Sequence, residues 1–161
     1  LLAIALEDEV PNLIKNSVQL KFIGDLERFD KELKQKMKSA EKKTKLPEKS
    51  KRLDLIIAAS YGGRWDIVEA VKKITVNKNS KSEISEENFK QFMSLSDTPD
   101  PDICIRTGGE RRLSNFLLWQ LAYSELYFTN VLWPDFDSQQ LDIALDEFSK
   151  RNRRYGDTSN F

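Results

Sequence analysis

Three arginines, a glutamate and a serine follow one short apolar run in the second half of the chain. The run is 103–105, and after it come Gly108-Gly109 and the polar residues Arg106, Glu110, Arg111, Arg112 and Ser114. A strand that turns into a helix presents unpaired N–H groups at the helix start, and neighbouring guanidinium groups there favour an anion such as a diphosphate. Ser114 is placed to cap that helix or to donate its hydroxyl to the anion. Similar turns also occur without a ligand, so the spacing alone leaves diphosphate binding open.

Glu125 is a further candidate functional residue in this stretch. The apolar pattern after Ser114 predicts a helix that ends near Glu125, on the same face as Leu118 and Leu121. A carboxylate at the end of a buried stripe is costly without a partner, so Glu125 is expected to have a function. The aromatic residues of the same helix, Trp119 and Tyr123, are expected in the core.

A second Gly-Gly turn follows the apolar run 53–60. It reads Tyr61-Gly62-Gly63-Arg64 and leads into a predicted helix whose buried stripe is Ile67, Val68, Val71 and Ile74. Arg64 is a candidate ligand residue, but the same four residues also suit a tight turn with no ligand. Both readings of Arg64 remain open at this point.

The elements that must position these residues alternate between strand and helix. Strands are expected at 18–24, 53–60 and 103–105. A helix stopped by Pro11 should precede the first strand, one capped by Asp25 should follow it, and one capped by Asp137 should end the domain. This order predicts an α/β fold with a mostly parallel sheet and helices on both faces. Ligands bind beyond the strand C-termini in such sheets, so Arg64 and Arg106 are expected on one rim.

Composition limits the other functional classes. The 161 residues are 39% hydrophobic, which suits a single domain over 1–161 with a basic, then polar tail at 150–161. Lysine plus arginine and aspartate plus glutamate are balanced at 26 each, which argues against a nucleic-acid partner. The absence of histidine and the single Cys104 exclude internal disulfides and Cys/His zinc sites. A cytoplasmic protein with at most peripheral membrane contact is expected.

The residue identities in 101–136 are more informative about function than the spacing of the polar residues. The string IRTGGERRLSNFLLWQLAYSELYF followed by LWPDF resembles the C-terminal signature of the cis-prenyltransferases, most closely that of the bacterial undecaprenyl diphosphate synthases. The resemblance extends from the first residue to about 156. It implies condensation of isopentenyl diphosphate with an allylic diphosphate such as farnesyl diphosphate, assisted by Mg²⁺. The implied product is a long polyprenyl diphosphate, with the undecaprenyl carrier of bacterial cell-wall synthesis as the expected case.

The resemblance also implies roles for single residues. Arg106, Arg112 and Ser114 match positions that hold the diphosphate of isopentenyl diphosphate. The paired N–H donors of an arginine guanidinium suit the oxygens of a diphosphate. Glu110 lies where it could orient the arginines by ion pairing. Arg111 falls where the family varies and is expected to face outward.

Further positions extend this implied site. Glu125 matches a glutamate that helps to hold Mg²⁺, which requires oxygen ligands. Trp133 and Asp135 match positions near the active site, although a Trp-Pro-Asp turn also has a structural use. Arg154 and Gly156 match an arginine-x-glycine motif that reaches the partner's diphosphate site, which implies a homodimer.

The sequence departs from the family pattern at two places. The sequence starts downstream of the Asp-Gly-Asn-Gly-Arg loop that carries the family's catalytic aspartate, so the chain is expected to be an N-terminally truncated domain that is inactive by itself. Ser60 stands where the family usually has asparagine. The alternative function is a non-catalytic, prenyltransferase-like subunit that supports a catalytic partner. Residues of 53–59 and the apolar face of the first helix are candidate walls for the product chain, with core packing as the other account.

Overall fold

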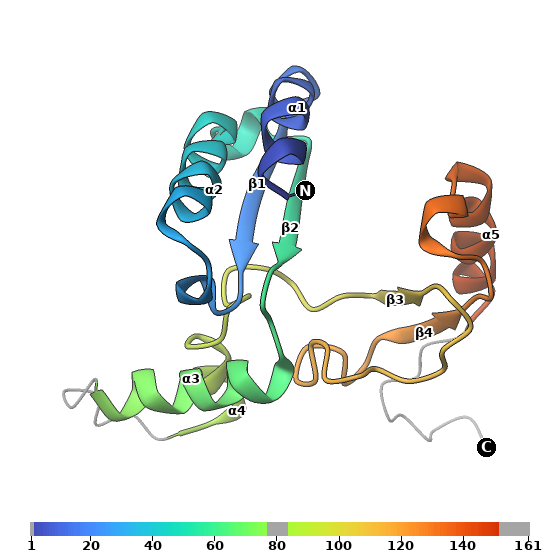
Figure 1. Cartoon of the computed structure of the whole chain (residues 1–161). Coiled ribbons are helices and arrows are strands. Elements are labelled where there is room, and N and C mark those ends of the chain that lie inside the picture. Colours follow the sequence, from blue (N-terminus) through green and yellow to red (C-terminus); the bar gives the residue numbers. More distant parts are fainter. Residues whose placement is uncertain (1, 77–83, 152–161) are drawn as a thin grey trace. The chain divides into compact units, whose positions relative to one another are not determined.

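The computed structural model describes residues 2–76 and 84–151 (Figure 1). The chain divides into two compact units, Leu1–Ser96 and Asp97–Phe161, and each is described by itself. The elements of the first unit are α1 (Leu2–Lys15), β1 (Val18–Ile23), a 3₁₀ turn (Leu26–Arg28), α2 (Lys31–Thr44), a 3₁₀ turn (Glu48–Ser50), β2 (Leu53–Ala58), α3 (Gly63–Val76) and α4 (Glu86–Lys90). The second contains β3 (Ile103–Arg106), β4 (Glu125–Phe128), a 3₁₀ turn (Trp133–Asp135) and α5 (Ser138–Ser149).

The core of the first unit forms where α1 and α2 pack against β1 (Figure 1). β1 and β2 are parallel, in a register that runs from Val18 opposite Leu53 to Ile23 opposite Ala58. The apolar residues of the two helices meet those of β1, together with Ala59 just after β2, in one buried cluster: Leu6, Val10, Leu20, Phe22, Met37, Ala40 and Ala59. The alternation of apolar residues predicted β1, and the continuous apolar run predicted β2. The α/β class with parallel strands is confirmed.

Side chains of α2 also satisfy the backbone of β1. The Thr44 hydroxyl accepts a hydrogen bond from the Leu20 N–H at 3.0 Å and donates one to the Ala40 carbonyl at 2.9 Å. The Glu41 carboxylate accepts from the Phe22 N–H at 2.8 Å. These two N–H groups point away from β2, so without α2 they would need water or another strand.

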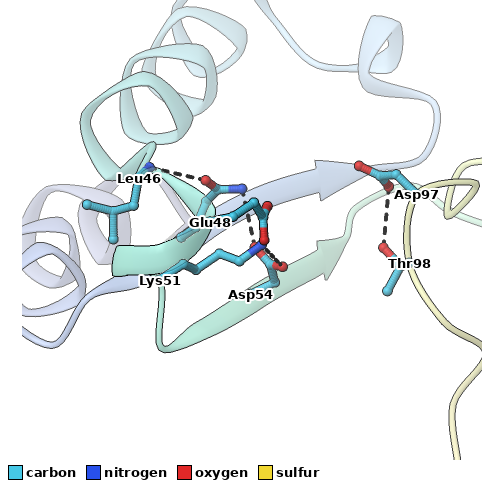
Figure 2. Close-up of polar contacts among 7 residues, drawn as sticks. Leu46, Glu48, Lys51, Asp54, Asp97 and Thr98 are labelled. Carbon is cyan, nitrogen blue, oxygen red and sulfur yellow. Dashed lines mark hydrogen bonds and ion pairs between the residues drawn. The ribbon is translucent and has the colours of Figure 1, made fainter.

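The loop that leads into β2 is held by a polar network (Figure 2). Gln19 of β1 donates to the Asp54 carboxylate at 3.2 Å and accepts from the Leu46 N–H at 3.2 Å. The Lys51 ammonium group lies 2.7 Å from Asp54 and 2.8 Å from Glu48. Hydrogen bonds to these two carboxylates raise the pKa of Lys51. The charged loop is therefore attached to both strands.

Two predicted helix boundaries are wrong. α1 does not stop at Pro11 but continues to Lys15 with the proline inside. Asp25 makes no side-chain cap bond, and only a 3₁₀ turn follows it. The cap of α2 is Asp30, which has an extended backbone and accepts from the Leu33 N–H at 2.8 Å.

The buried side of α3 differs from the predicted stripe. Val68 is 51% exposed and Val71 is exposed, whereas Gly63, Asp66 and Ala70 are buried. β2 is likewise not covered on both faces, because Leu53 and Leu55 are exposed. In the described residues, β1–β2 and β3–β4 form two separate two-stranded sheets.

Asp66 is a fully buried carboxylate with three donors. It accepts from the Tyr61 hydroxyl at 2.9 Å, from the Ser94 N–H at 2.9 Å and from the Ser94 hydroxyl at 2.7 Å. The network joins the start of the Tyr61-Gly62-Gly63-Arg64 turn to the segment after α4. Periodicity gave no sign of it, because the position lies on a helix expected to bury only apolar residues.

Replacing Asp66 with alanine is expected to lower the free energy of unfolding by about 3 kcal/mol, because the partly buried Ser94 N–H and Tyr61 hydroxyl lose their acceptor. Urea unfolding followed by circular dichroism measures the change. Asp66→Asn keeps an acceptor for Ser94 and should lose clearly less. Equal losses for both variants would contradict this account.

The second unit contains the largest correction to the sequence-based prediction. The expected helix from Ser114 to Glu125 is replaced by consecutive turns. Ser114, Asn115 and Leu117 have positive φ angles, which break the α-helical ladder at its start. Glu125 is the first residue of β4, which pairs in parallel with β3.

The last helix begins as predicted. The Asp137 side chain accepts from the Gln140 N–H at 3.0 Å and caps α5. Ala144 of α5 is buried, whereas Leu141 and Leu145 are exposed. No helix in 2–76 or 84–151 is long and apolar enough to span a bilayer.

Candidate anion-binding site

Arg106, Arg112 and Ser114 meet in the second unit. The Arg106 Nη1 donates to the Ser114 hydroxyl oxygen at 2.9 Å, and the Arg112 Nε donates to the same oxygen at 3.2 Å. Arg106 Nη1 also donates to the backbone carbonyl of Arg112. The Ser114 oxygen thus accepts twice, and its own hydrogen remains for donation to a further acceptor.

The Gly108-Gly109 turn positions this cluster but does not offer its own N–H groups. Both glycines have positive φ angles, near +82° and +76°. The Gly108 N–H donates to the Val131 carbonyl at 2.8 Å, and the Gly109 N–H donates to the Thr129 carbonyl at 2.9 Å. The helix start whose unpaired N–H groups were expected to face an anion is also absent, because turns follow Ser114. The Gly108-Gly109 turn instead attaches the loop after β3 to the segment after β4.

Glu110 forms an ion pair with Arg112, in the manner the sequence suggested. The pair holds the Arg112 guanidinium from one side, while Ser114 contacts its Nε. Arg111 is exposed, as expected. Two guanidinium groups and one carboxylate leave a net positive charge at the cluster, which favours an anionic ligand.

A pocket of about 270 Å³ adjoins these side chains. Arg106, Arg112 and Ser114 form its polar end. Its remaining lining residues are mainly apolar: Cys104, Ile105, Leu113, Phe116 and Phe128. Burial raises the pKa of the Cys104 thiol, and the charge of Arg106 acts in the opposite direction. The pocket can hold a small molecule with an anionic head and an apolar body.

Glu125 lies outside this pocket lining and has a basic partner. Its Oε2 is 2.8 Å from Arg151 Nη1, which also donates to the Leu126 carbonyl at 3.0 Å. The described residues contain no group of three His, Cys, Asp or Glu side chains that could hold a metal ion. One carboxylate that is already paired with a guanidinium does not fit a magnesium site by itself.

The Glu125–Arg151 pair is expected to stabilise the contact between β4 and the end of α5. Because both side chains are partly exposed, a double-mutant cycle of Glu125→Gln and Arg151→Ala should give a coupling of about 0.5–1 kcal/mol in urea unfolding. Lys150→Ala removes the neighbouring exposed pair with Asp146 and serves as the control. If Glu125→Gln lowers the free energy of unfolding equally in the wild type and in the Arg151→Ala variant, the ion pair does not contribute to stability.

The other predicted site residues do not join the cluster. Trp133 is 75% exposed and stacks on Phe136 with ring centroids 6.2 Å apart, and Asp135 is also exposed. Arg64 is exposed on α3 of the first unit, so its convergence with Arg106 stays a prediction.

Arg154 and Gly156 lie outside the described residues. Tyr123 is 69% exposed, so its assignment to the core is wrong.

Two residues at or near the site could not be assigned there from the sequence. Arg151 had no visible link to Glu125, because the two are 26 positions apart and meet only through tertiary packing. Cys104 was placed in the strand before Arg106 but not in the site, and in the structure it lines the pocket.

Residues 1–156 match the family model described as "Putative undecaprenyl diphosphate synthase". An isoprenyl transferase of Neisseria meningitidis serogroup A is 48% identical over 155 residues, which are 96% of this chain and 60% of that protein. The ditrans,polycis-undecaprenyl-diphosphate synthase ((2E,6E)-farnesyl-diphosphate specific) of Photorhabdus laumondii is 47% identical over 158 residues, covering 96% and 61%.

Two solved structures are also similar. Lavandulyl diphosphate synthase from Lavandula x intermedia, in complex with dimethylallyl diphosphate, aligns with a TM-score of 0.89 and 37% identity over 96% of this chain and 68% of that one. A probable undecaprenyl diphosphate synthase from Campylobacter jejuni aligns with a TM-score of 0.85 and 35% identity, covering 96% and 72%. The chain spans about 60% of the length of the curated relatives it matches. The resemblance seen in the sequence is confirmed, and the chain belongs to the undecaprenyl diphosphate synthase family of cis-prenyltransferases.

Proposed function

We propose that the protein to which this chain belongs is a cis-prenyltransferase. It condenses isopentenyl diphosphate with an allylic diphosphate such as farnesyl diphosphate and produces a long polyprenyl diphosphate, with undecaprenyl diphosphate as the expected product. Family membership supports the reaction class. The observation that carries the proposal to this chain is the meeting of Arg106, Arg112 and Ser114 at one pocket.

In this proposal the cluster holds the diphosphate of isopentenyl diphosphate. Arg106 and Arg112 offer charged N–H donors that remain protonated at any working pH, and Ser114 adds a hydroxyl donor. Glu110 fixes the direction of the Arg112 guanidinium through their ion pair. The apolar walls then face the five-carbon body of the substrate, which keeps the reacting carbon end away from the charged end.

A second pocket supports the expected place of the growing hydrocarbon chain. It measures about 190 Å³ and lies in the first unit. The apolar face of α1 and two residues of β2 line most of it: Leu2, Ala5, Leu6, Val10, Leu13, Leu55 and Ile57. Its lining is almost entirely apolar and agrees with the walls expected from the sequence. Burial of apolar surface would drive the chain into it.

The proposal has three further parts that come from the resemblance. The whole protein uses Mg²⁺, to which Glu125 contributes at most one carboxylate, since the described residues make no metal site alone. It acts as a homodimer in which Arg154 and Gly156 reach the partner's diphosphate site. It is cytoplasmic, with peripheral contact to the membrane through its lipid product.

Titration calorimetry of isopentenyl diphosphate into the chain tests the binding half of the proposal. Binding that is tighter than that of inorganic diphosphate is expected, because the apolar walls recognise the hydrocarbon part. A folded chain that binds neither compound would overturn the assignment of the cluster.

Incorporation of labelled isopentenyl diphosphate into farnesyl diphosphate by the whole protein tests the catalytic half. A product of long chain length is expected in the presence of Mg²⁺. Binding by the chain with no turnover by the whole protein would favour a non-catalytic subunit that supports a catalytic partner.

A further inference from the structure

α2 carries a row of lysines along the face opposite its buried side. The buried side consists of Met37, Ala40 and Thr44. At 100° per residue, the lysines at four positions fall within an arc of about 60° on the other side of the helix. They are Lys31, Lys38, Lys42 and the C-cap residue Lys45. From the first to the last, the row is about 21 Å long at 1.5 Å per residue.

These four lysines, called the lysine row below, differ from the other lysines of α2 in their surroundings. All four are exposed. Lys34 pairs with Glu27, and Lys36 pairs with Glu7 and Glu32, but the described part of the chain gives no member of the row an ion pair. Lys38 contributes weakly to the lowered pKa of Glu27, after Lys34.

The charge is concentrated here although the chain as a whole is neutral. Residues 31–52 contain ten lysines and arginines and three glutamates, against 26 basic and 26 acidic residues in the whole chain. The excess positive charge is therefore concentrated in α2 and the loop that follows it. A basic side orients a protein on an extended anionic surface.

We propose that the lysine row docks the protein on an anionic lipid surface. A straight row of ammonium groups suits a plane of phosphate headgroups, and the absence of apolar residues within the row implies binding at the headgroups without insertion. The row contains no aromatic side chain that could stack on bases and no arginine that could form paired hydrogen bonds to base edges. This disfavours a nucleic acid as the partner. The choice of a bilayer also rests on the proposed function, because a polyprenyl product leaves water for a membrane.

Docking through α2 would be purely electrostatic and reversible. Each lysine near an anionic surface multiplies the binding constant about fivefold, so loss of all four charges should reduce binding by more than a hundredfold. The attraction falls steeply as salt shortens the screening length. Binding should therefore be clear at 50 mM salt and weak at 300 mM.

Sedimentation with sucrose-loaded vesicles tests the proposal on the full chain without substrate. Vesicles of phosphatidylcholine with 30% phosphatidylglycerol are compared with vesicles of phosphatidylcholine alone. The test variant carries Lys31→Gln, Lys38→Gln, Lys42→Gln and Lys45→Gln. The control variant loses the same charge elsewhere, through Lys15→Gln, Lys72→Gln, Lys90→Gln and Lys150→Gln. Circular dichroism verifies that both variants are folded.

The expected result is binding of the wild type and the control to the anionic vesicles alone, with loss of binding in the test variant. Equal loss in both variants would overturn the proposal, because net charge rather than the row would then be the cause. Absent wild-type binding, or equal binding to neutral vesicles, would also overturn it. Tighter binding of a single-stranded RNA than of the vesicles, lost in the test variant, would replace the bilayer by a nucleic acid.

The outcome is separable from that of the proposed function. Calorimetry of isopentenyl diphosphate with the test variant should match the wild type, because the row contributes no residue to the pocket of the second unit. Failure of vesicle binding with intact substrate binding would overturn the docking surface alone. Failure of substrate binding with intact docking would overturn the site alone.

Discussion

Replacing Arg112 with alanine is expected to weaken binding of isopentenyl diphosphate about 5- to 150-fold, which corresponds to about 1–3 kcal/mol for hydrogen bonds to a charged group. The guanidinium lies at the polar end of the pocket and contacts both Ser114 and Glu110. Its removal takes away a diphosphate donor and also leaves Glu110 as an uncompensated negative charge beside the site. The second effect adds repulsion to the lost attraction. Titration calorimetry on the folded variant measures both together.

Arg111→Ala is the matched control for this variant. Arg111 is the adjacent arginine and is exposed, and it does not line the pocket. Its loss should change affinity by less than about threefold, the scale of a screened surface charge. If Arg111→Ala and Arg112→Ala weaken binding equally, the general positive field would explain binding, and the specific contact would be excluded. Glu110→Ala in the Arg112→Ala background should recover part of the lost affinity.

Replacing Gly24 with alanine is expected to destabilise the first unit by more than about 3 kcal/mol. A Cβ at this position would lie 2.0 Å from the backbone oxygen of Ala59, and backbone cannot rotate away as a side-chain end can. The φ angle of +117° is also one that residues with a Cβ rarely adopt. Relief would require separating the ends of β1 and β2, where the Ala59 N–H donates to the Ile23 carbonyl at 2.8 Å.

Gly108→Ala separates the two causes in Gly24→Ala. Gly108 also has a positive φ, near +82°, but nothing lies within 4 Å of its added Cβ. Gly108→Ala should therefore lower the free energy of unfolding only by the cost of backbone strain, about 1 kcal/mol. Urea unfolding of both variants gives the comparison. Similar losses would mean that the φ angle alone matters and that the close approach to Ala59 is relaxed in solution.

The parts of the fold that were predictable from sequence are those with a local cause. The alternation in 18–24 and the apolar run 53–60 predicted β1 and β2, because strand periodicity depends on neighbours along the chain. The cap of α5 by Asp137 was predictable for the same reason. The meeting of Arg106, Arg112 and Ser114 also follows from one short stretch, since all three lie on one strand end and its following turn.

The errors lie where tertiary contacts override the local pattern. The stretch after Ser114 has a helical apolar period, but left-handed residues at Ser114 and Asn115 divert the backbone into turns. Glu125 was predicted at the end of that helix, which does not form, and its partner Arg151 lies 26 positions further along the chain. Asp66 is buried because Ser94 and Tyr61 bring three donors to it, which no period of α3 could indicate.

The bonds from α2 to β1 also bear on the behaviour of the protein at high concentration. An open strand edge is a template on which other chains add strands and aggregate. The Leu20 and Phe22 N–H groups on the outer side of β1 are already bound by Thr44 and Glu41. An incoming strand would have to displace two side chains of a packed helix before it could form its first backbone bonds there. α2 thus hinders fibre-like self-association along this edge of β1.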